Sequence, residues 1–169
     1  PKCGYIAILG APNAGKSTLL NRLTGSKLAI VTPKVQTTRN RILGITAEGD
    51  TQLVFMDTPG IFEAGKPFEQ AMVESAWASA AEADLLLLLV DARRGLDTQT
   101  EAILTRLEDM PTRQALALNK IDLVKKTELL VLAETLNQKG RFSHTFMLSA
   151  EHGDGVNDLK RTVAEDIPE

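Results

Sequence analysis

Short apolar runs alternate with longer amphipathic stretches along most of the chain. The short runs predict strands at residues 5–9, 42–46, 52–56, 85–90, 114–118 and 145–148. The longer stretches predict helices at residues 16–23, 67–83, 98–109, 126–139 and 156–167, several of them followed by glycine or proline. This alternation is typical of an α/β domain with a mainly parallel sheet, helices on both faces, and ligands at the carboxyl ends of the strands.

Three strands depart from simple alternation. Residues 47–51 are too short a link for a crossover, so the strands at 42–46 and 52–56 are expected to form an antiparallel hairpin. Residues 85–90 are apolar on both faces, which favours a central parallel strand. A buried helix segment is the alternative, but the run is short and is followed by Asp91 and an Arg-Arg-Gly turn. We therefore expect a six-stranded sheet with one antiparallel strand.

The composition narrows the class of protein. A chain of 169 residues, 43% hydrophobic and 24% charged, fits one globular domain. With 19 basic and 22 acidic residues the net charge is −3, which argues against nucleic-acid binding through bulk positive charge. The single cysteine fits a reducing compartment, and the apolar run at 85–90 is too short to cross a bilayer. These features favour a protein of a reducing compartment without a bilayer-spanning run.

The segment Gly10–Ser17 matches the pattern G-x-x-x-x-G-K-[ST] between a predicted strand and a predicted helix. Its glycines let the backbone wrap a phosphate, and Lys16 is expected to reach the β- and γ-phosphates. The hydroxyl of Ser17 is expected to bind Mg²⁺. A glycine-rich turn with a chance lysine is the alternative. The residues expected to line the phosphates are Asn13, Ala14, Gly15, Lys16, Ser17 and Thr18.

A second motif follows the strand at 114–118 and predicts which base is bound. The carboxylate of Asp122 can accept both donors on the edge of guanine, N1–H and the 2-amino group, whereas adenine lacks that pair. Asn119 can tie neighbouring loops together, and the stem of Lys120 can cover the ring. Backbone amides of Ser149 and Ala150 are expected to face the guanine carbonyl. The alternative is that Asp122 merely caps a helix.

Two further segments are expected to respond to the γ-phosphate. Asp57, at the end of a strand, is expected to hold Mg²⁺, and the amide of Gly60 to approach the γ-phosphate. Thr38, in the polar stretch at 26–40, is expected to complete the Mg²⁺ shell. Ordinary turn chemistry and strand-edge threonines are the alternatives.

Taken together, five motifs resemble those of the translation-factor-class P-loop GTPases, in the order that family has them. They are Gly10–Ser17, Thr38, the segment 57–60, the segment 119–122, and Ser149-Ala150. The stretches 10–21 and 33–45 are similar to the Era-like family of these enzymes, while MnmE-like and Der-like GTPases differ before Thr37-Thr38-Arg39. The resemblance implies a G domain that binds GTP or GDP with Mg²⁺. It also implies that the reducing compartment is the cytoplasm, and that the protein is a monomer that takes part in small-subunit assembly through 16S rRNA, with peripheral association at the inner membrane.

Members of that family continue into a KH domain that binds RNA, and such a domain needs a Gly-x-x-Gly loop. No two glycines of this chain have that spacing. The resemblance therefore covers a G domain at residues 1–169 without the KH domain, a piece of a longer protein, and it does not extend RNA binding to these residues.

The residues expected to act in hydrolysis are Lys16, Thr38, Gly60 and Asn13. Ile61 stands where Ras-like enzymes have a glutamine that orients water, so another group must supply that help or hydrolysis is slow. The resemblance implies that Asn13 can help hold K⁺ against the phosphates; an ordinary turn residue is the alternative. The rival functions are a GTP-loaded binding module with negligible hydrolysis, a MnmE-like or Der-like GTPase, and a P-loop kinase.

Overall fold

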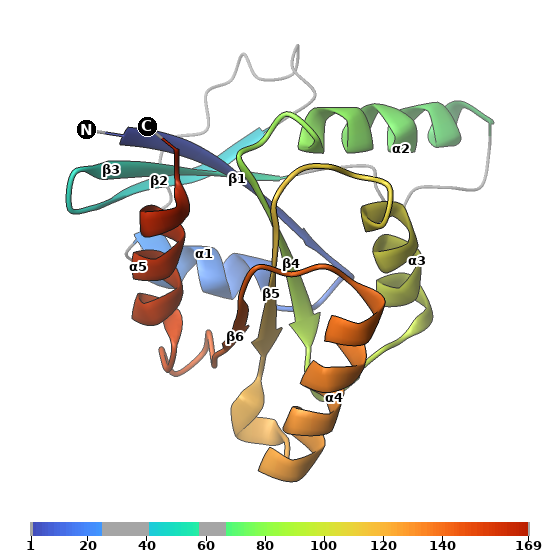
Figure 1. Cartoon of the computed structure of the whole chain (residues 1–169), viewed down its shortest axis with the longest axis vertical. Coiled ribbons are helices and arrows are strands. Elements are labelled where there is room, and N and C mark those ends of the chain that lie inside the picture. Colours follow the sequence, from blue (N-terminus) through green and yellow to red (C-terminus); the bar gives the residue numbers. More distant parts are fainter. Residues whose placement is uncertain (1, 25–40, 58–66, 169) are drawn as a thin grey trace.

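The computed structural model describes residues 2–24, 41–57 and 67–168, which form a six-stranded sheet with helices on both faces (Figure 1). The strands, in the spatial order β2-β3-β1-β4-β5-β6, are β1 (Lys2–Gly10), β2 (Arg41–Glu48), β3 (Thr51–Asp57), β4 (Leu85–Asp91), β5 (Gln114–Asn119) and β6 (Thr145–Met147). The helices are α1 (Lys16–Thr24), α2 (Pro67–Ala80), α3 (Thr98–Leu107), α4 (Lys126–Lys139) and α5 (Val156–Asp166), with a 3₁₀ turn η2 (Ile121–Leu123). The predicted order of elements is confirmed.

The pairing of the strands confirms the mixed sheet. β1 lies parallel to both β3 and β4, and β4, β5 and β6 continue the parallel arrangement. Only β2 is antiparallel, and it pairs with β3 through a tight turn in which Gly49 adopts a φ of 60°. A register shift between Ile42 and Gly44 marks a bulge in β2.

Side chains of alternate strand residues pack into two separate cores, one on each face of the sheet. On β1, Ala7 and Leu9 point into the core beneath α2, α3 and α4, whereas Ile6 and Ile8 point into the core beneath α1 and α5. All seven residues of β4 are buried. The run at 85–90 is apolar on both faces because it serves both cores at the centre of the sheet.

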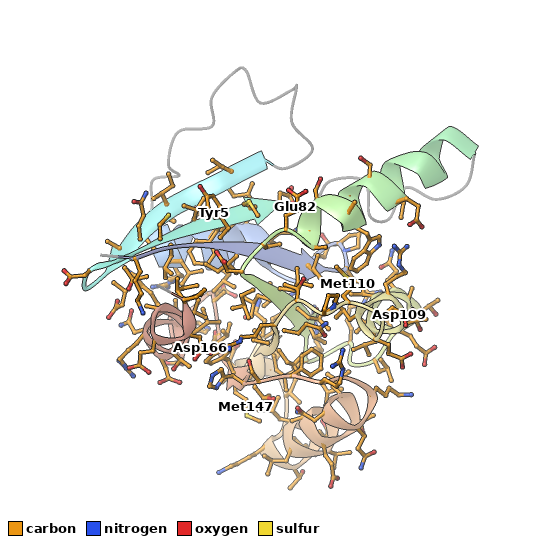
Figure 2. The ribbon with its side chains drawn as sticks, turned by 45° about the horizontal axis from the view of Figure 1, so that its top comes forward. Tyr5, Glu82, Asp109, Met110, Met147 and Asp166 are labelled. Atoms are coloured by element: carbon orange, nitrogen blue, oxygen red, sulfur yellow. The ribbon has the colours of Figure 1, made fainter. Side chains whose placement is uncertain are left out.

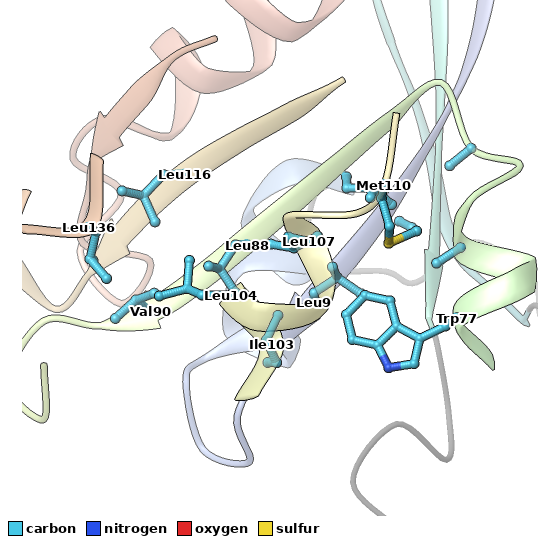
Figure 3. Close-up of a cluster of buried hydrophobic side chains, with 14 of the residues drawn as sticks. Leu9, Trp77, Leu88, Val90, Ile103, Leu104, Leu107, Met110, Leu116 and Leu136 are labelled. Carbon is cyan, nitrogen blue, oxygen red and sulfur yellow. The ribbon is translucent and has the colours of Figure 1, made fainter. Parts of the chain in front are cut away.

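Trp77 anchors the core on the α2–α3 side, as Figure 3 shows. Its ring is only 4% exposed, and the guanidinium of Arg106 lies 5.1 Å from the ring centroid. The same guanidinium makes two bonds to the Glu74 carboxylate, at 2.8 and 3.0 Å. The helix α2 is thereby fixed to α3 by an aromatic anchor and a bidentate ion pair.

The structure corrects several predicted helix ends. The helix expected at 67–83 ends at Ala80, the one at 98–109 ends at Leu107, and the one at 156–167 ends at Asp166. In the first case residues 81–83 continue as a turn whose amides donate to the last helical carbonyls. Asp166, labelled beside α5 in Figure 2, lies 2.7 Å from the ring of His144 and so ties the end of α5 to the approach to β6. Among the described residues, no helix is both long enough and apolar enough to span a membrane.

Candidate nucleotide-binding site

Four neighbouring strands end at the same edge of the sheet, three of them in a polar residue and one in glycine. Asp57 ends β3, Gly10 ends β1, Asp91 ends β4 and Asn119 ends β5. Because these strands are parallel and adjacent, their carboxyl ends meet, as the crevice rule for open α/β sheets requires. The site is therefore assembled from segments that are distant in the sequence.

The loop between β1 and α1 surrounds a cleft of about 600 Å³. Every residue from Gly10 to Thr18 lines it, together with Lys120 and Glu151. The predicted phosphate-binding residues Asn13, Ala14, Gly15, Lys16, Ser17 and Thr18 are thus brought to one cavity. Since α1 begins at Lys16, the positive end of its dipole faces the same space.

Glycine is required at both ends of this loop. At Gly10 a Cβ would lie 2.8 Å from the carbonyl oxygen of Leu89. Gly15 has a φ of 105°, and a Cβ there would collide with the side-chain amide of Asn119. Asn13 also has a positive φ, of 70°, in the left-handed region that asparagine tolerates better than most residues. The loop geometry therefore explains why these residue types occur here.

The ammonium of Lys16 lies 2.8 Å from the Asp57 carboxylate. The two side chains are 30% and 14% exposed, so the pair sits partly shielded at the mouth of the cleft. Lys16 is the group expected to meet the phosphates and Asp57 the group expected to meet Mg²⁺. Their contact shows that the two predicted sites are adjacent.

The side chain of Asn119 joins two loops, as the sequence analysis expected. Its amide nitrogen donates to the carbonyl of Ala14 at 2.9 Å, and its amide oxygen accepts from the backbone N–H of Ala150, also at 2.9 Å. Asn119 is only 2% exposed, so both bonds are shielded from water. This one side chain fixes the phosphate loop relative to the loop after β6.

Lys120 extends from the same segment over the phosphate loop. Its ammonium donates to the carbonyl of Asn13 at 3.1 Å and to the Asp91 carboxylate at 3.0 Å. The backbone of Lys120 is left-handed, with a φ of 67°. The stem consequently lines the cleft, where the sequence analysis expected it to cover a base.

Asp122 lies within η2, with its side chain 28% exposed. It does not cap a helix: α4 is preceded by Lys125, η2 by Lys120, and neither has a side-chain cap bond. The capping alternative is therefore wrong. The ring of His152 lies 3.4 Å from the Asp122 carboxylate. The expected contact of Asp122 with a guanine base stays a prediction.

The amides of Ser149 and Ala150 have protein partners in this structure. The N–H of Ala150 donates to Asn119, and the N–H of Ser149 donates to the carbonyl of Asp154 at 2.9 Å. Both residues are almost fully buried. They shape the loop and hold Asn119, and their expected contact with a guanine carbonyl stays a prediction.

Some of the predicted site residues lie outside the part of the chain that the structure describes. These are Thr38 and Gly60. Their expected parts in metal binding and hydrolysis stay predictions.

The sequence analysis missed two contributors to the site. Asp91 is 6% exposed and pairs with Lys120. Arg22, on α1, donates to the backbone carbonyls of Ala150 and Glu151 and so holds the loop after β6. A signal for Asp91 was present, because it ends an apolar strand as Asp57 and Asn119 do. Arg22 gave no such signal, since its partners are backbone groups.

A phosphate loop at the start of α1, an acid at the end of β3 and an Asn-Lys-x-Asp segment tied to that loop define a P-loop nucleotide-binding domain of the G-domain type. Residues 5–120 match the family described as 50S ribosome-binding GTPase. The chain belongs to this family.

Relatives and solved structures agree with that assignment. The chain is 51% identical over 168 residues to GTPase Era of Afipia carboxidovorans, covering 99% of this chain and 54% of that protein. A variant of Era from Aquifex aeolicus bound to GDP and AlF₄⁻ is similar with a TM-score of 0.80 and 36% identity, over 100% of this chain and 58% of that one. Era in complex with MgGDPNP and a 16S rRNA fragment has a TM-score of 0.81 and 37% identity, over 99% and 58%. The chain thus spans about half the length of the curated relatives it matches.

Proposed function

We propose that residues 1–169 form the GTP-binding and GTP-hydrolysing domain of a ribosome-assembly switch. The observation that carries this proposal is the pair of hydrogen bonds made by the Asn119 side chain. They tie the phosphate loop to the loop after β6, which is expected to border the base. A triphosphate in the cleft and a base beside Asp122 would belong to one ligand. The Mg²⁺-bound nucleotide of the similar Era structure supports the same assignment.

The residues divide the chemistry between them. Lys16 and the loop amides stabilise the charge that develops on the transferred γ-phosphoryl group. The hydroxyl of Ser17, the carboxylate of Asp57 and the hydroxyl of Thr38 are proposed to hold Mg²⁺, which would neutralise negative charge on the phosphates. Water attacks the γ-phosphorus directly as the bond between that phosphorus and the β–γ bridging oxygen breaks. The electron pair of that bond stays on GDP, and the proton released by the water passes to solvent, leaving inorganic phosphate. The amide of Gly60 is proposed to sense whether the γ-phosphate is present.

Base selection gives the sharpest test of this function. Asp122→Asn replaces one acceptor by a donor, so the guanine 2-amino group loses its partner. Xanthine carries a carbonyl at that position and gains one. We expect the wild-type chain to prefer GDP over XDP and Asp122→Asn to reverse that preference, by at least a hundredfold in the ratio of dissociation constants. An unchanged ratio would remove Asp122 from base recognition.

Hydrolysis separates an enzyme from a GTP-loaded binding module. We propose that K⁺, held in part by Asn13, assists the reaction in place of the missing glutamine. Because Asn13 has a φ of 70°, Asn13→Gly removes the side chain without straining the loop, whereas Asn13→Ala would add strain. The single-turnover rate of GTP hydrolysis should be higher in K⁺ than in Na⁺ for the wild type, and the same in both salts for Asn13→Gly. Equal, very slow rates in both salts for the wild type would favour the binding module.

The ribosomal partner is proposed as the small subunit. The family description names the 50S particle, whereas the similar Era structure contains 16S rRNA and matches 99% of this chain. We favour the small subunit because of that similarity. We also expect the longer protein to be monomeric and cytoplasmic, with peripheral membrane association. Co-sedimentation of the GTP-loaded longer protein with isolated subunits tests this assignment. Preferential pelleting with large subunits would favour a Der-like role.

A further inference from the structure

A buried carboxylate lies beside the nucleotide cleft and has no part in the function described above. Asp91 ends β4 and is 6% exposed. A buried charge of this kind is stable only when it is paired and hydrogen-bonded. Its bonding partners therefore indicate what it does.

The two oxygens of this carboxylate have different partners. Oδ1 accepts from the backbone N–H of Arg93 at 2.9 Å, which fixes the carboxylate to its own loop. Oδ2 accepts from the ammonium of Lys120 at 3.0 Å. The guanidinium of Arg93 is more distant, at 3.8 Å from Oδ2, and its side chain is 58% exposed. Lys120 is thus the principal charge partner.

Lys120 needs such a partner to hold its position. A long lysine side chain loses rotamer freedom when it is fixed, and its backbone already has an unfavourable left-handed φ of 67°. Two oxygens oppose this cost: the Asn13 carbonyl from the phosphate loop and the Asp91 carboxylate from β4. The carboxylate is the only charged one of the two, and it is itself anchored.

We infer that Asp91 is a positioning residue for guanine-nucleotide binding, which holds the Lys120 stem across the cleft before the nucleotide arrives. This inference rests on the proposed function. Without the carboxylate, nucleotide binding must first order Lys120, which lowers affinity. The chemistry of hydrolysis at the γ-phosphate is left intact, because within the described residues the Asp91 carboxylate contacts Arg93 and Lys120, neither of which is proposed to hold a phosphate or Mg²⁺.

The primary test is Asp91→Asn, which keeps the shape and the bond to the Arg93 amide but removes the charge. We expect GDP affinity to fall and KM for GTP to rise by about tenfold, the effect of one charge-assisted hydrogen bond, with kcat within twofold. Arg93→Gln is the matched control, and it should leave GDP affinity and KM for GTP within twofold of the wild type. A rise in KM below twofold for Asp91→Asn, or an equal effect of Arg93→Gln, would overturn the inference.

A double-mutant cycle identifies Lys120 as the intermediary. Lys120→Met keeps the stem and leaves Asp91 as an unpaired buried charge. Adding Asp91→Asn to it should restore resistance to urea and cause no further loss of GDP affinity. Additive losses of affinity would overturn the inference, and this comparison stands even if Asp91→Asn alone folds poorly. Failure of the wild-type chain to bind GDP would contradict the proposed function instead.

Discussion

At the scale of single residues, the site depends on side chains whose partners are backbone groups of distant loops. Asn119 illustrates this, because its amide serves one carbonyl and one N–H in loops separated by most of the chain. Removing it would leave both groups buried without a partner. A buried polar group without a partner lowers the free energy of unfolding by more than its hydrogen bond had contributed, because its loss of hydration is no longer compensated.

We therefore expect Asn119→Ala to lower the free energy of unfolding of the nucleotide-free chain by about 2–4 kcal/mol, at one to two kcal/mol for each orphaned group. GDP binding should become undetectable at micromolar nucleotide. Urea unfolding and fluorescent-nucleotide titration measure the two effects.

Asn137→Ala is the matched control for that change. Asn137 also makes two side-chain hydrogen bonds, donating to the carbonyl of Ala133 and to the hydroxyl of Thr145, but it lies outside the cleft. Removing the Asn137 amide should lower the free energy of unfolding by less than about 1 kcal/mol, because water can replace the hydrogen bonds of a more exposed side chain. GDP affinity should be unchanged, and a comparable loss in both variants would contradict the bridging function of Asn119.

At the scale of elements, the start of α3 shows how a single carboxylate fixes a helix that covers the sheet. The Asp97 side chain accepts the N–H of Thr100 at 2.8 Å and caps the helix. Burial acts to raise the pKa of Asp97, but the amide and hydroxyl of Thr100 and the Arg94 guanidinium outweigh it and hold the pKa below the ordinary value. The ionised form is thus favoured in the folded state.

This shift predicts how the stability of α3 depends on pH. A lowered folded-state pKa contributes stability that is present above about pH 4, the unfolded value, and is lost as the pH falls through the folded value. Asp97→Ala should cost about 1 kcal/mol at pH 7, and the difference from wild type should shrink below pH 4. Urea unfolding at several pH values measures it. Asp97→Asn keeps the cap without titrating, so its cost at pH 7 should be smaller while its difference from wild type changes with pH as that of Asp97→Ala does. A difference from wild type that does not change with pH in either variant would contradict the assignment.

At the scale of the whole molecule, a ligand that bridges the phosphate loop and the base loop binds only the folded chain. GDP with Mg²⁺ at a hundred times its Kd should therefore stabilise the fold by about 2.7 kcal/mol. For a domain of this size that corresponds to a rise in Tm of about 5–10 °C. Calorimetry measures the shift, and ATP at the same concentration should give no comparable one. Equal shifts with both nucleotides would contradict guanine selectivity.

Much of this architecture could be predicted because the sequence repeats one signal. The apolar runs at 52–56, 85–90 and 114–118 are each followed by a polar residue at the same edge of the sheet, so the sequence pattern alone identifies Asp57 and Asn119. The run at 85–90 could be placed at the centre because it is apolar on both faces. Periodicity alone contained that information.

What could not be predicted depends on pairing between distant side chains and on backbone conformation. No local pattern shows that Asp91 meets Lys120, or that Arg22 holds the carbonyls of the loop after β6. The left-handed φ of Lys120 was likewise invisible, since lysine has no preference for that region. The end of α2 was missed because Ala81, Glu82 and Ala83 are all good helix formers, and the chain turns there to enter β4.

The long separation between the loops that Asn119 joins has a consequence for how the chain is made. Its partners lie 105 residues before it and 31 residues after it. At typical synthesis rates of about 5–20 residues per second, roughly 7–27 seconds separate the appearance of Ala14 from that of Ala150. During that interval the phosphate loop already exists but its guanine side is incomplete. If the domain binds a guanine nucleotide as proposed, a newly made chain would retain it only after its last strand is in place, and nucleotide capture would report that step of folding.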